Sequence, residues 1–258
     1  LFVHYGKVLS GNIQLKDNVE MKIDVERRHN IRAYHSATHL LHESLRRVLG
    51  THVIQKGSLV ESNRLRFDFS HMKPISPQEI DKIETFVNSM IDKKTDVKTR
   101  IMTPKEAVDN GALALFGEKY GDEVRVVKMQ NNANDKYSIE LCGGTHVSRT
   151  GDIGMFKIIS ESALGSGIRR IEAVAGKAAL DVFQNYNNLI GEISSEMRVS
   201  SENLKDRITS LIADKKILEK TENKVKAKIK DEGAEFSLDN VEKFASFQMK
   251  QVKANLPI

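Results

Sequence analysis

The sequence of 258 residues contains one cysteine, four prolines and no tryptophan, and it lacks a long apolar run. A single cysteine excludes an internal disulfide framework and fits a reducing cytoplasm. Because a membrane-spanning helix needs about 20 consecutive apolar residues, no span is expected. The first residues also lack the basic and apolar regions of a signal peptide. The sequence therefore predicts a cytoplasmic protein without a membrane partner, and its start at Leu1 instead of a methionine predicts a fragment or a cleaved product.

The composition is that of a globular and mildly basic chain. Apolar residues make up 40% of the sequence and charged residues 29%, as in ordinary globular domains. The length is sufficient for one large domain or two small ones. The net charge of +5 is compatible with a nucleic-acid partner but is not diagnostic of one.

Two short motifs contain residues that could bind a metal: His35 and His39 in H-S-A-T-H, and Cys142 and His146 in C-G-G-T-H. On a helix, the i, i+4 spacing places both side chains on one face. Either pair alone is more often an ordinary pair of surface or core residues. Together they offer three imidazoles and one thiolate, which suit one Zn²⁺ ion. The ion could be structural or catalytic, and the motifs do not decide between the two.

Alternation and capping signals predict an α+β fold. Residues 1–28 alternate and predict short strands in a small barrel or sheet. Asn30 is a candidate N-cap for a helix over 31–49 that Gly50 would end. The central part of the chain predicts a hairpin over 52–69, a helix from the Ser76 cap to about residue 93, a strand over 97–102, a short helix ending at Gly111, and the strands V-R-V-V-K-M, Y-S-I-E-L, M-F-K-I-I-S and I-R-R-I-E-A-V.

After residue 176 the strand signals stop and heptad stripes begin. Phe183, Ile190 and Met197 recur every seven residues, and a second stripe starts at Leu204. The break at residues 199–201 between the two stripes predicts an antiparallel helical hairpin. The predicted organisation is a partial β-barrel (1–29), a mixed α/β domain around the zinc site (30–175), the helical hairpin (176–232) and a tail of uncertain structure (233–258).

Longer motifs place the chain near a known family. It closely resembles the editing domain of alanyl-tRNA synthetases in the segments H-S-A-T-H-L-L-H, Q-K-G-S-L-V, L-R-F-D-F-S-H, E-L-C-G-G-T-H-V and G-I-R-R-I-E-A-V-A-G. The resemblance spans roughly residues 1–175. It implies that the helices after residue 176 begin a spacer leading to a C-terminal domain, and that an ATP-dependent aminoacylation core, whose motifs are absent here, lies upstream.

The resemblance implies a hydrolytic function. In this family the editing domain hydrolyses Ser-tRNA(Ala) or Gly-tRNA(Ala), so the implied partner is the acceptor end of a mischarged tRNA(Ala), and the implied cofactor is one Zn²⁺ ion. Such a second site is needed because an apolar pocket discriminates against one added hydroxyl by only about 1–3 kcal/mol. A site that forms a hydrogen bond with the hydroxyl discriminates on the order of 10⁴-fold.

Candidate roles can be given to six further residues. Thr38, next to His39, is expected to read the serine hydroxyl, unless its own hydroxyl bonds to the helix carbonyl at i−4. Gln55 is at a position that the resemblance marks as active-site, where it would hold the ester carbonyl or orient water. Contacts with tRNA are expected from the Gly-rich turn and the arginine pair, which are Gly165, Gly167, Arg169 and Arg170.

Three other functions remain open at this point. The chain could be a free-standing deacylase, which shares both zinc motifs. It could be a tRNA-binding module that has a structural zinc and no turnover. An unrelated metallohydrolase is the third possibility, although H-E-x-x-H and a carboxylate-rich metal site are both absent from the sequence.

Overall fold

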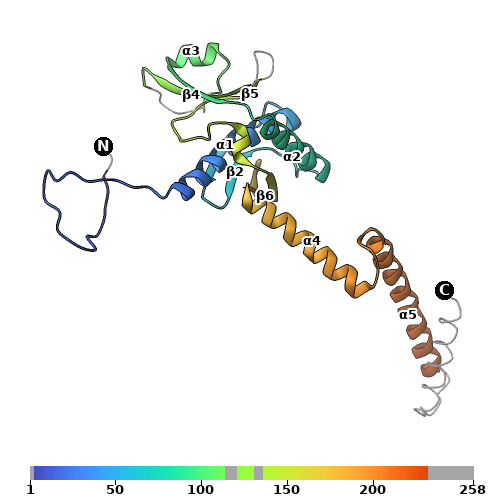
Figure 1. Ribbon diagram of the computed structural model, residues 1–258. Helices are drawn as coiled ribbons and strands as arrows, with labels where there is room; N and C mark the ends of the chain where they lie inside the picture. The colour runs from blue at the N-terminus through green and yellow to red at the C-terminus, as the bar shows by residue number, and fades with distance from the viewer. Residues whose placement is uncertain (1–2, 114–120, 131–135, 232–258) are drawn as a thin grey trace. The chain divides into compact units, whose positions relative to one another are not determined.

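The computed structural model describes residues 3–113, 121–130 and 136–231 (Figure 1). It combines helices with antiparallel sheets, as the α+β expectation has it. The larger sheet has the order β1-β2-β7-β6, formed by Gln55–Val60, Leu65–Ser70, Ile168–Ala175 and Phe156–Gly165. The smaller sheet has the order β3-β4-β5, formed by Val97–Met102, Val124–Gln130 and Lys136–Leu141. Neither sheet closes into a barrel within the described residues.

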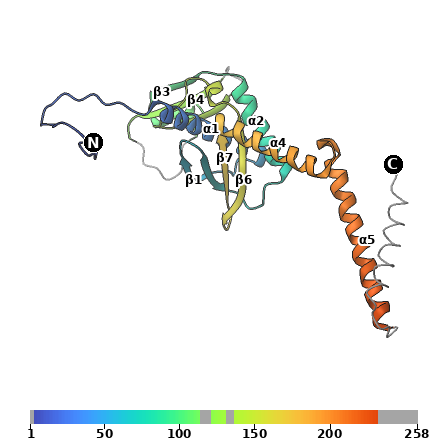
Figure 2. The ribbon, with the colours of Figure 1, turned by 60° about the horizontal axis from the view of Figure 1, so that its bottom comes forward.

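Helix α1 (Val25–Leu49) lies between the two sheets in both views (Figure 1, Figure 2). Helix α2 (Pro77–Asp92) packs beside it, and the short helix α3 (Pro104–Asp109) packs on β4. The 3₁₀ turn η1 (Thr150–Ile153) contacts both α1 and α2. Helix α1 therefore packs against strands of both sheets.

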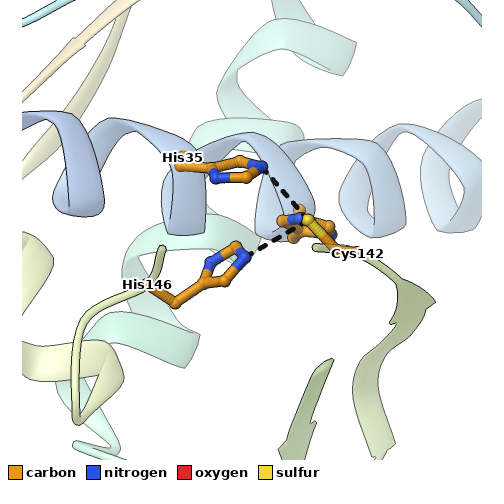
Figure 3. A group of neighbouring side chains, drawn as sticks. His35, Cys142 and His146 are labelled. Carbon is orange, nitrogen blue, oxygen red and sulfur yellow. Dashed lines mark hydrogen bonds between the residues drawn. The ribbon is translucent and has the colours of Figure 1, made fainter. Parts of the chain in front are cut away.

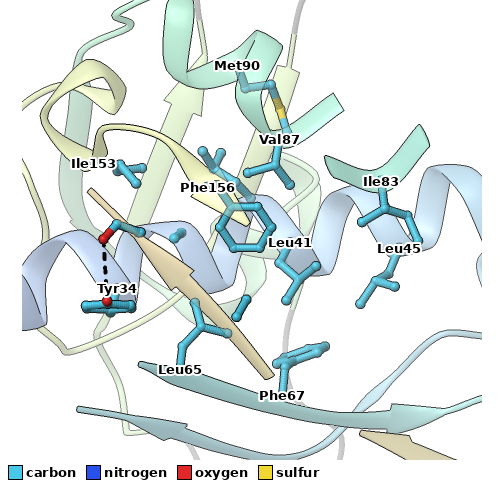
Figure 4. Close-up of a cluster of buried hydrophobic side chains, with 14 of the residues drawn as sticks. Tyr34, Leu41, Leu45, Leu65, Phe67, Ile83, Val87, Met90, Ile153 and Phe156 are labelled. Atoms are coloured by element: carbon cyan, nitrogen blue, oxygen red, sulfur yellow. Dashed lines mark hydrogen bonds between the residues drawn. The ribbon is translucent and has the colours of Figure 1, made fainter. Parts of the chain in front are cut away.

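The main core fills the space between α1, α2 and the larger sheet (Figure 4). Leu41 and Leu45 of α1 are fully buried. They meet side chains from β2, α2 and β6, including Phe67, Ile83 and Phe156. A smaller cluster lies under α3 and uses the other face of β4, so that Val126 serves the small cluster and Val127 the main core, in line with the two-residue period of a strand.

The strands predicted for residues 1–28 were wrong. Residues 3–24 form no strand, and α1 begins at Val25 with Asp24 as its N-cap, so Asn30 lies inside the helix. The carboxylate of Asp24 accepts a hydrogen bond from the backbone N–H of Arg27. Alternation is an insufficient signal here because a strand also needs a neighbour for its backbone groups, and the side chains of residues 3–24 are all exposed.

The predicted hairpin, the end of α1 and the starts of α2 and α3 agree with the structure. The hairpin over 52–69 is formed by β1 and β2, whose residues Val60 and Leu65 pair across the turn. Gly50 ends α1, and its N–H donates to the carbonyl of Arg46. Both capping boxes form: Ser76 with Glu79, and Thr103 with Glu106.

Replacing Ser76 with alanine is expected to lower the free energy of unfolding by about 1 kcal/mol, because α2 loses its N-cap. The Ser76 hydroxyl accepts from the Glu79 N–H and donates to the Glu79 carboxylate, with an O–O distance of 2.7 Å. Urea unfolding checks the value. The matched control is Ser89→Ala in the same helix, where the hydroxyl donates to the carbonyl of Phe86 and alanine is a better helix former. An equal loss in both variants would contradict the capping role.

The C-terminal region contains two helices, α4 (Lys177–Met197) and α5 (Leu204–Asp231), separated by the 3₁₀ turn η2 (Ser201–Asn203). The two helices and the break between them are therefore confirmed. Pairing into an antiparallel hairpin would cover the heptad stripes. Ile190 and Leu218 are exposed, whereas Met197, Leu204 and Leu211 are partly buried, so the stripes are covered only in part. The described part of the chain divides into two compact units, with the division between residues 185 and 186. The predicted tail, 233–258, lies outside the described residues.

None of the helices in the described ranges has both the length and the apolar composition that crossing a bilayer requires.

Candidate metal centre

The four candidate ligands come together at one place. His35 and His39 lie one turn apart on α1, whereas Cys142 and His146 lie in the loop that directly follows β5, so the second pair is not helical. The Nε2 atoms of His35 and His146 are each 3.4 Å from the Cys142 sulfur (Figure 3). One ligand atom from each of the four residues lies within 4.8 Å of the others.

These residues fit a tetrahedral ion. Zn–N bonds of about 2.1 Å and a Zn–S bond of about 2.3 Å place nitrogen and sulfur about 3.6 Å apart at the tetrahedral angle. The observed separation of 3.4 Å agrees with that geometry. The donor set of imidazoles and a thiol is also the one that zinc prefers over magnesium or calcium. The group could therefore hold a metal ion, and its chemistry favours zinc.

Gly144 is needed because the His35 ring occupies the space of its missing side chain. A Cβ built on Gly144 would lie 2.1 Å from Cε1 of His35, whereas a Cβ on Gly143 would meet nothing within 4 Å. The close approach of the loop backbone to the ring is what allows two ligands from the loop to reach two ligands from α1.

We therefore expect Gly144→Ala to weaken metal binding by about tenfold or more, since His35 must move to admit the methyl group. Zinc titration against a chromophoric chelator measures the change. Gly143→Ala is the matched control, because it adds the same methyl group one residue earlier in open space. If both variants bind zinc like the unchanged chain, the contact between loop and ring has no part in the site.

Residues behind the ligands orient their rings. The Ser36 hydroxyl is 3.1 Å from Nδ1 of His146 and also accepts from the N–H of Val147. Glu140 lies behind His39, with 2.8 Å between Nδ1 of His39 and Oε2, a charge contact whose geometry is not that of a straight hydrogen bond. Partners of this kind fix the tautomer of a metal-ligating histidine, so that the other ring nitrogen faces the ion.

Arg125 of β4 ties the ligand loop to the smaller sheet. Its Nη1 donates to the carbonyls of Gly144 and Cys142, and its own carbonyl accepts from the N–H of Cys142. The loop is therefore held at both ends of the Cys142-Gly143-Gly144 turn. Fixing a loop in this way reduces the conformational freedom that metal binding would otherwise remove.

Neighbouring groups shift the pKa values of the ligands even without an ion. Burial by itself would raise the pKa of Cys142, but hydrogen bonds with His146 and His35 and the interaction with His39 lower it to about 3. Burial would lower the pKa of His39, whereas the Glu140 carboxylate and the Cys142 sulfur raise it to about 10. Burial lowers the pKa of His146 to about 4. At neutral pH the thiolate and the His146 imidazole are therefore ready to bind, and His39 must first release a proton.

The two residues expected to touch the substrate are placed differently. Thr38 is buried beside His39, and its hydroxyl donates to the carbonyl of Tyr34, with an O–O distance of 2.9 Å. This is the i−4 bond that was the alternative reading of Thr38, and it leaves the oxygen lone pairs as acceptors. Gln55 is the first residue of β1, is partly exposed, and pairs through its backbone with Phe69.

The arginine pair lies on β7, with both side chains in ion pairs. Both guanidinium groups make two contacts with a carboxylate: Arg169 with Glu161, and Arg170 with Asp68 at 2.7 and 2.8 Å. Gly165 pairs with Ile168 at the end of the β6-β7 hairpin, and Gly167 in the turn has φ +70°. The arginines therefore strengthen the larger sheet, whatever else they contact.

Sequence reasoning missed Glu140, Ser36 and Arg125. The histidine partners of Glu140 and Ser36 are more than 90 positions away, so no local pattern names them. Glu140 did carry one weak signal, since it stands two residues before Cys142 at the end of a strand, where alternate residues share a face.

Comparison with known proteins agrees with this geometry. The family model described as "Threonyl and Alanyl tRNA synthetase second additional domain" matches residues 124–172. An alanine--tRNA ligase from Parvibaculum lavamentivorans is 56% identical over 85% of this chain and 25% of its own length. The ligases from Mesorhizobium japonicum and Granulibacter bethesdensis are 48% and 53% identical, over 89% and 85% of the chain and 26% and 25% of their own lengths.

The chain spans about a quarter of the length of the curated relatives that it matches. The range that the family model matches includes Glu140 and three of the loop residues discussed above, Cys142, Gly144 and His146. On this similarity, the chain belongs with the alanyl-tRNA synthetases, as a segment that includes the second additional domain.

Proposed function

We propose that this segment hydrolyses tRNA(Ala) carrying serine or glycine. The observation that supports it most is the meeting of His35, His39, Cys142 and His146 within one small volume, in a segment related to alanyl-tRNA synthetases. We further propose that, in the whole protein, an aminoacylation core precedes this segment and a C-terminal domain follows it. We also propose that the protein is cytoplasmic.

The reaction is the addition of water to the ester carbonyl and loss of the ribose oxygen, which yields a free amino acid and intact tRNA. One Zn²⁺ ion, held by the four residues, would supply a Lewis acid for the ester once one ligand moves away or a fifth position admits the substrate. Gln55 would hold the ester carbonyl or orient the water, since its side chain is partly exposed and could reach a ligand. Thr38 would accept a hydrogen bond from the serine hydroxyl, because its own hydrogen is already given to Tyr34.

This role for Thr38 would favour tRNA carrying serine over tRNA carrying alanine. Alanine has no hydroxyl, so it could not satisfy a buried acceptor that serine satisfies. Correctly charged tRNA would therefore bind less well in the reactive position. Glycine, which also lacks the hydroxyl, would have to be admitted by its small size.

Contacts with tRNA would come from the end of the β6-β7 hairpin. Arg170 is the better exposed arginine, with 27% of its side chain accessible, against 12% for Arg169. Its Nη1 group takes no part in the pair with Asp68 and could donate to a phosphate. The turn containing Gly165 and Gly167 would let a backbone approach closely. Such contacts would weaken as salt rises.

The test is release of serine from Ser-tRNA(Ala) by the purified chain. Serine release should stop when a chelator removes the metal and return when zinc is added back. His39→Ala should lose the activity without losing the fold. Ala-tRNA(Ala) is the control substrate and should stay charged.

A second function is favoured by the closed ligand set. Four protein ligands that all bind leave no open position, and closed tetrahedral sites are usually structural. The segment would then bind tRNA without turnover. Tight tRNA binding with no serine release from the zinc-loaded chain would support this function and overturn the hydrolase.

A further inference from the structure

We propose that Glu140 is a positioning residue of the metal centre: it holds His39 with Nε2 turned toward the ion and offsets part of the charge that metal binding buries. The proposal concerns the same site as the proposed function and rests on its metal binding, but not on hydrolysis. Glu140 is not a ligand in the four-residue group.

The carboxylate is buried and held from three sides. The Glu140 side chain is 10% exposed. Oε2 lies 2.8 Å from Nδ1 of His39, and Oε1 lies 3.2 Å from Nδ1 of His42. The hydroxyl of Ser138 donates to the same Oε1, also at 3.2 Å. A carboxylate fixed by His42 and Ser138 on one oxygen presents the other oxygen to His39 in a set position.

That position determines the tautomer of His39. A carboxylate only accepts, so a carboxylate oxygen 2.8 Å from Nδ1 of His39 favours the tautomer with the hydrogen on that nitrogen. In the neutral ring the lone pair is then on Nε2, the nitrogen that is not in contact with Glu140 and is therefore available to the ion. Ser36 acts in the same way behind His146, where it can accept from Nδ1. Two of the three imidazoles are thus oriented from behind, and only His39 is oriented by a charge.

The charge of Glu140 matters because the site is buried. A Zn²⁺ ion and one thiolate leave a net charge of +1, and the guanidinium of Arg125 adds a positive charge at the ligand loop. A buried, unbalanced charge is unfavourable unless an opposite charge lies close by. Glu140 supplies that charge directly behind a ligand, so its removal should weaken metal binding even if the site keeps its shape.

The test is zinc affinity, measured with a chromophoric chelator as competitor and without tRNA. Glu140→Gln keeps the size and an acceptor oxygen but removes the charge. We expect affinity to fall by about 10- to 100-fold. Co²⁺ loaded in place of zinc should show an altered ligand-field spectrum, since the His39 ring is no longer held in one orientation.

The matched control is Asp68→Asn, which removes an equally buried carboxylate from the pair with Arg170 on the larger sheet. It should lower thermal stability and leave zinc affinity and the Co²⁺ spectrum unchanged. An unchanged zinc affinity in folded Glu140→Gln would overturn the proposal. So would an equal loss in both variants, which would mean that the effect is general destabilisation.

A measurement on the unchanged chain keeps the proposal testable if Glu140→Gln does not fold. Nitrogen chemical shifts of the zinc-loaded chain report which ring atom of each histidine carries hydrogen. We expect Nδ1–H and metal-bound Nε2 for His39, and the opposite assignment would refute the positioning role. A chain that binds zinc as described but releases no serine would refute hydrolysis and leave this role of Glu140 intact.

Discussion

Cys142→Ala is expected to lower zinc affinity by roughly 10²- to 10³-fold. Structural zinc sites bind with about 10–16 kcal/mol, which divides into about 2.5–4 kcal/mol for each of four ligands. Cys142 is the sole thiol of the chain, and both His35 and His146 point to its sulfur. Its loss removes the anionic ligand and leaves three imidazoles. Competition titration measures the affinity, and metal analysis of the purified variant should find little zinc.

The control for Cys142→Ala is Thr145→Ala in the same loop. Thr145 is exposed and is not among the four ligands. It should bind zinc like the unchanged chain. If Cys142→Ala also retained stoichiometric zinc, the metal would have to be held elsewhere, and both proposals about the site would fail together.

Phe156→Ala is expected to lower the free energy of unfolding of the first unit by about 3–5 kcal/mol. Phe156 is fully buried where β6 meets α1 and α2 (Figure 4). Its removal would leave a cavity among Leu41, Val87 and Ile153, which cannot all move inward. The backbone of Phe156 is also fixed, because Asn88 accepts from its N–H and donates to its carbonyl. Denaturant unfolding followed by circular dichroism gives the change.

Phe183→Ala is the control for this core prediction. It removes the same side chain from α4, where the ring is 59% exposed. Surface substitutions usually change stability by no more than about 0.5 kcal/mol. A comparable loss in the two variants would show that burial of Phe156 is not what stabilises the unit.

Much of the fold was predictable because its signals are local. The capping boxes at Ser76 and Thr103 contain both partners within four residues, and both form. The strand alternation of β2 and β4 is equally local, since Leu65, Phe67 and Phe69 are all buried on one face. For residues 3–24 the same kind of signal failed, because strand formation depends on a neighbour that alternation does not specify.

In the candidate site, too, the features with local sequence signals were predictable and those that depend on tertiary packing were not. Its ligand types were visible in two motifs, because zinc chemistry restricts which residues can serve. The partners behind them were not visible. The contact between Glu140 and His42 and the one between Ser36 and His146 join α1 to residues after β4, and they exist only once the smaller sheet has packed on the helix.

The position of the ligands in the chain has a consequence for how the protein unfolds. An ion bound to α1 and to the loop after β5 would cross-link positions about 100 residues apart, and a link that closes a loop of this length restricts the denatured ensemble by several kcal/mol in the chain-entropy model. The metal would therefore act as a reversible cross-link between the first helix and the loop after the smaller sheet. Removing the metal with a chelator would free both segments.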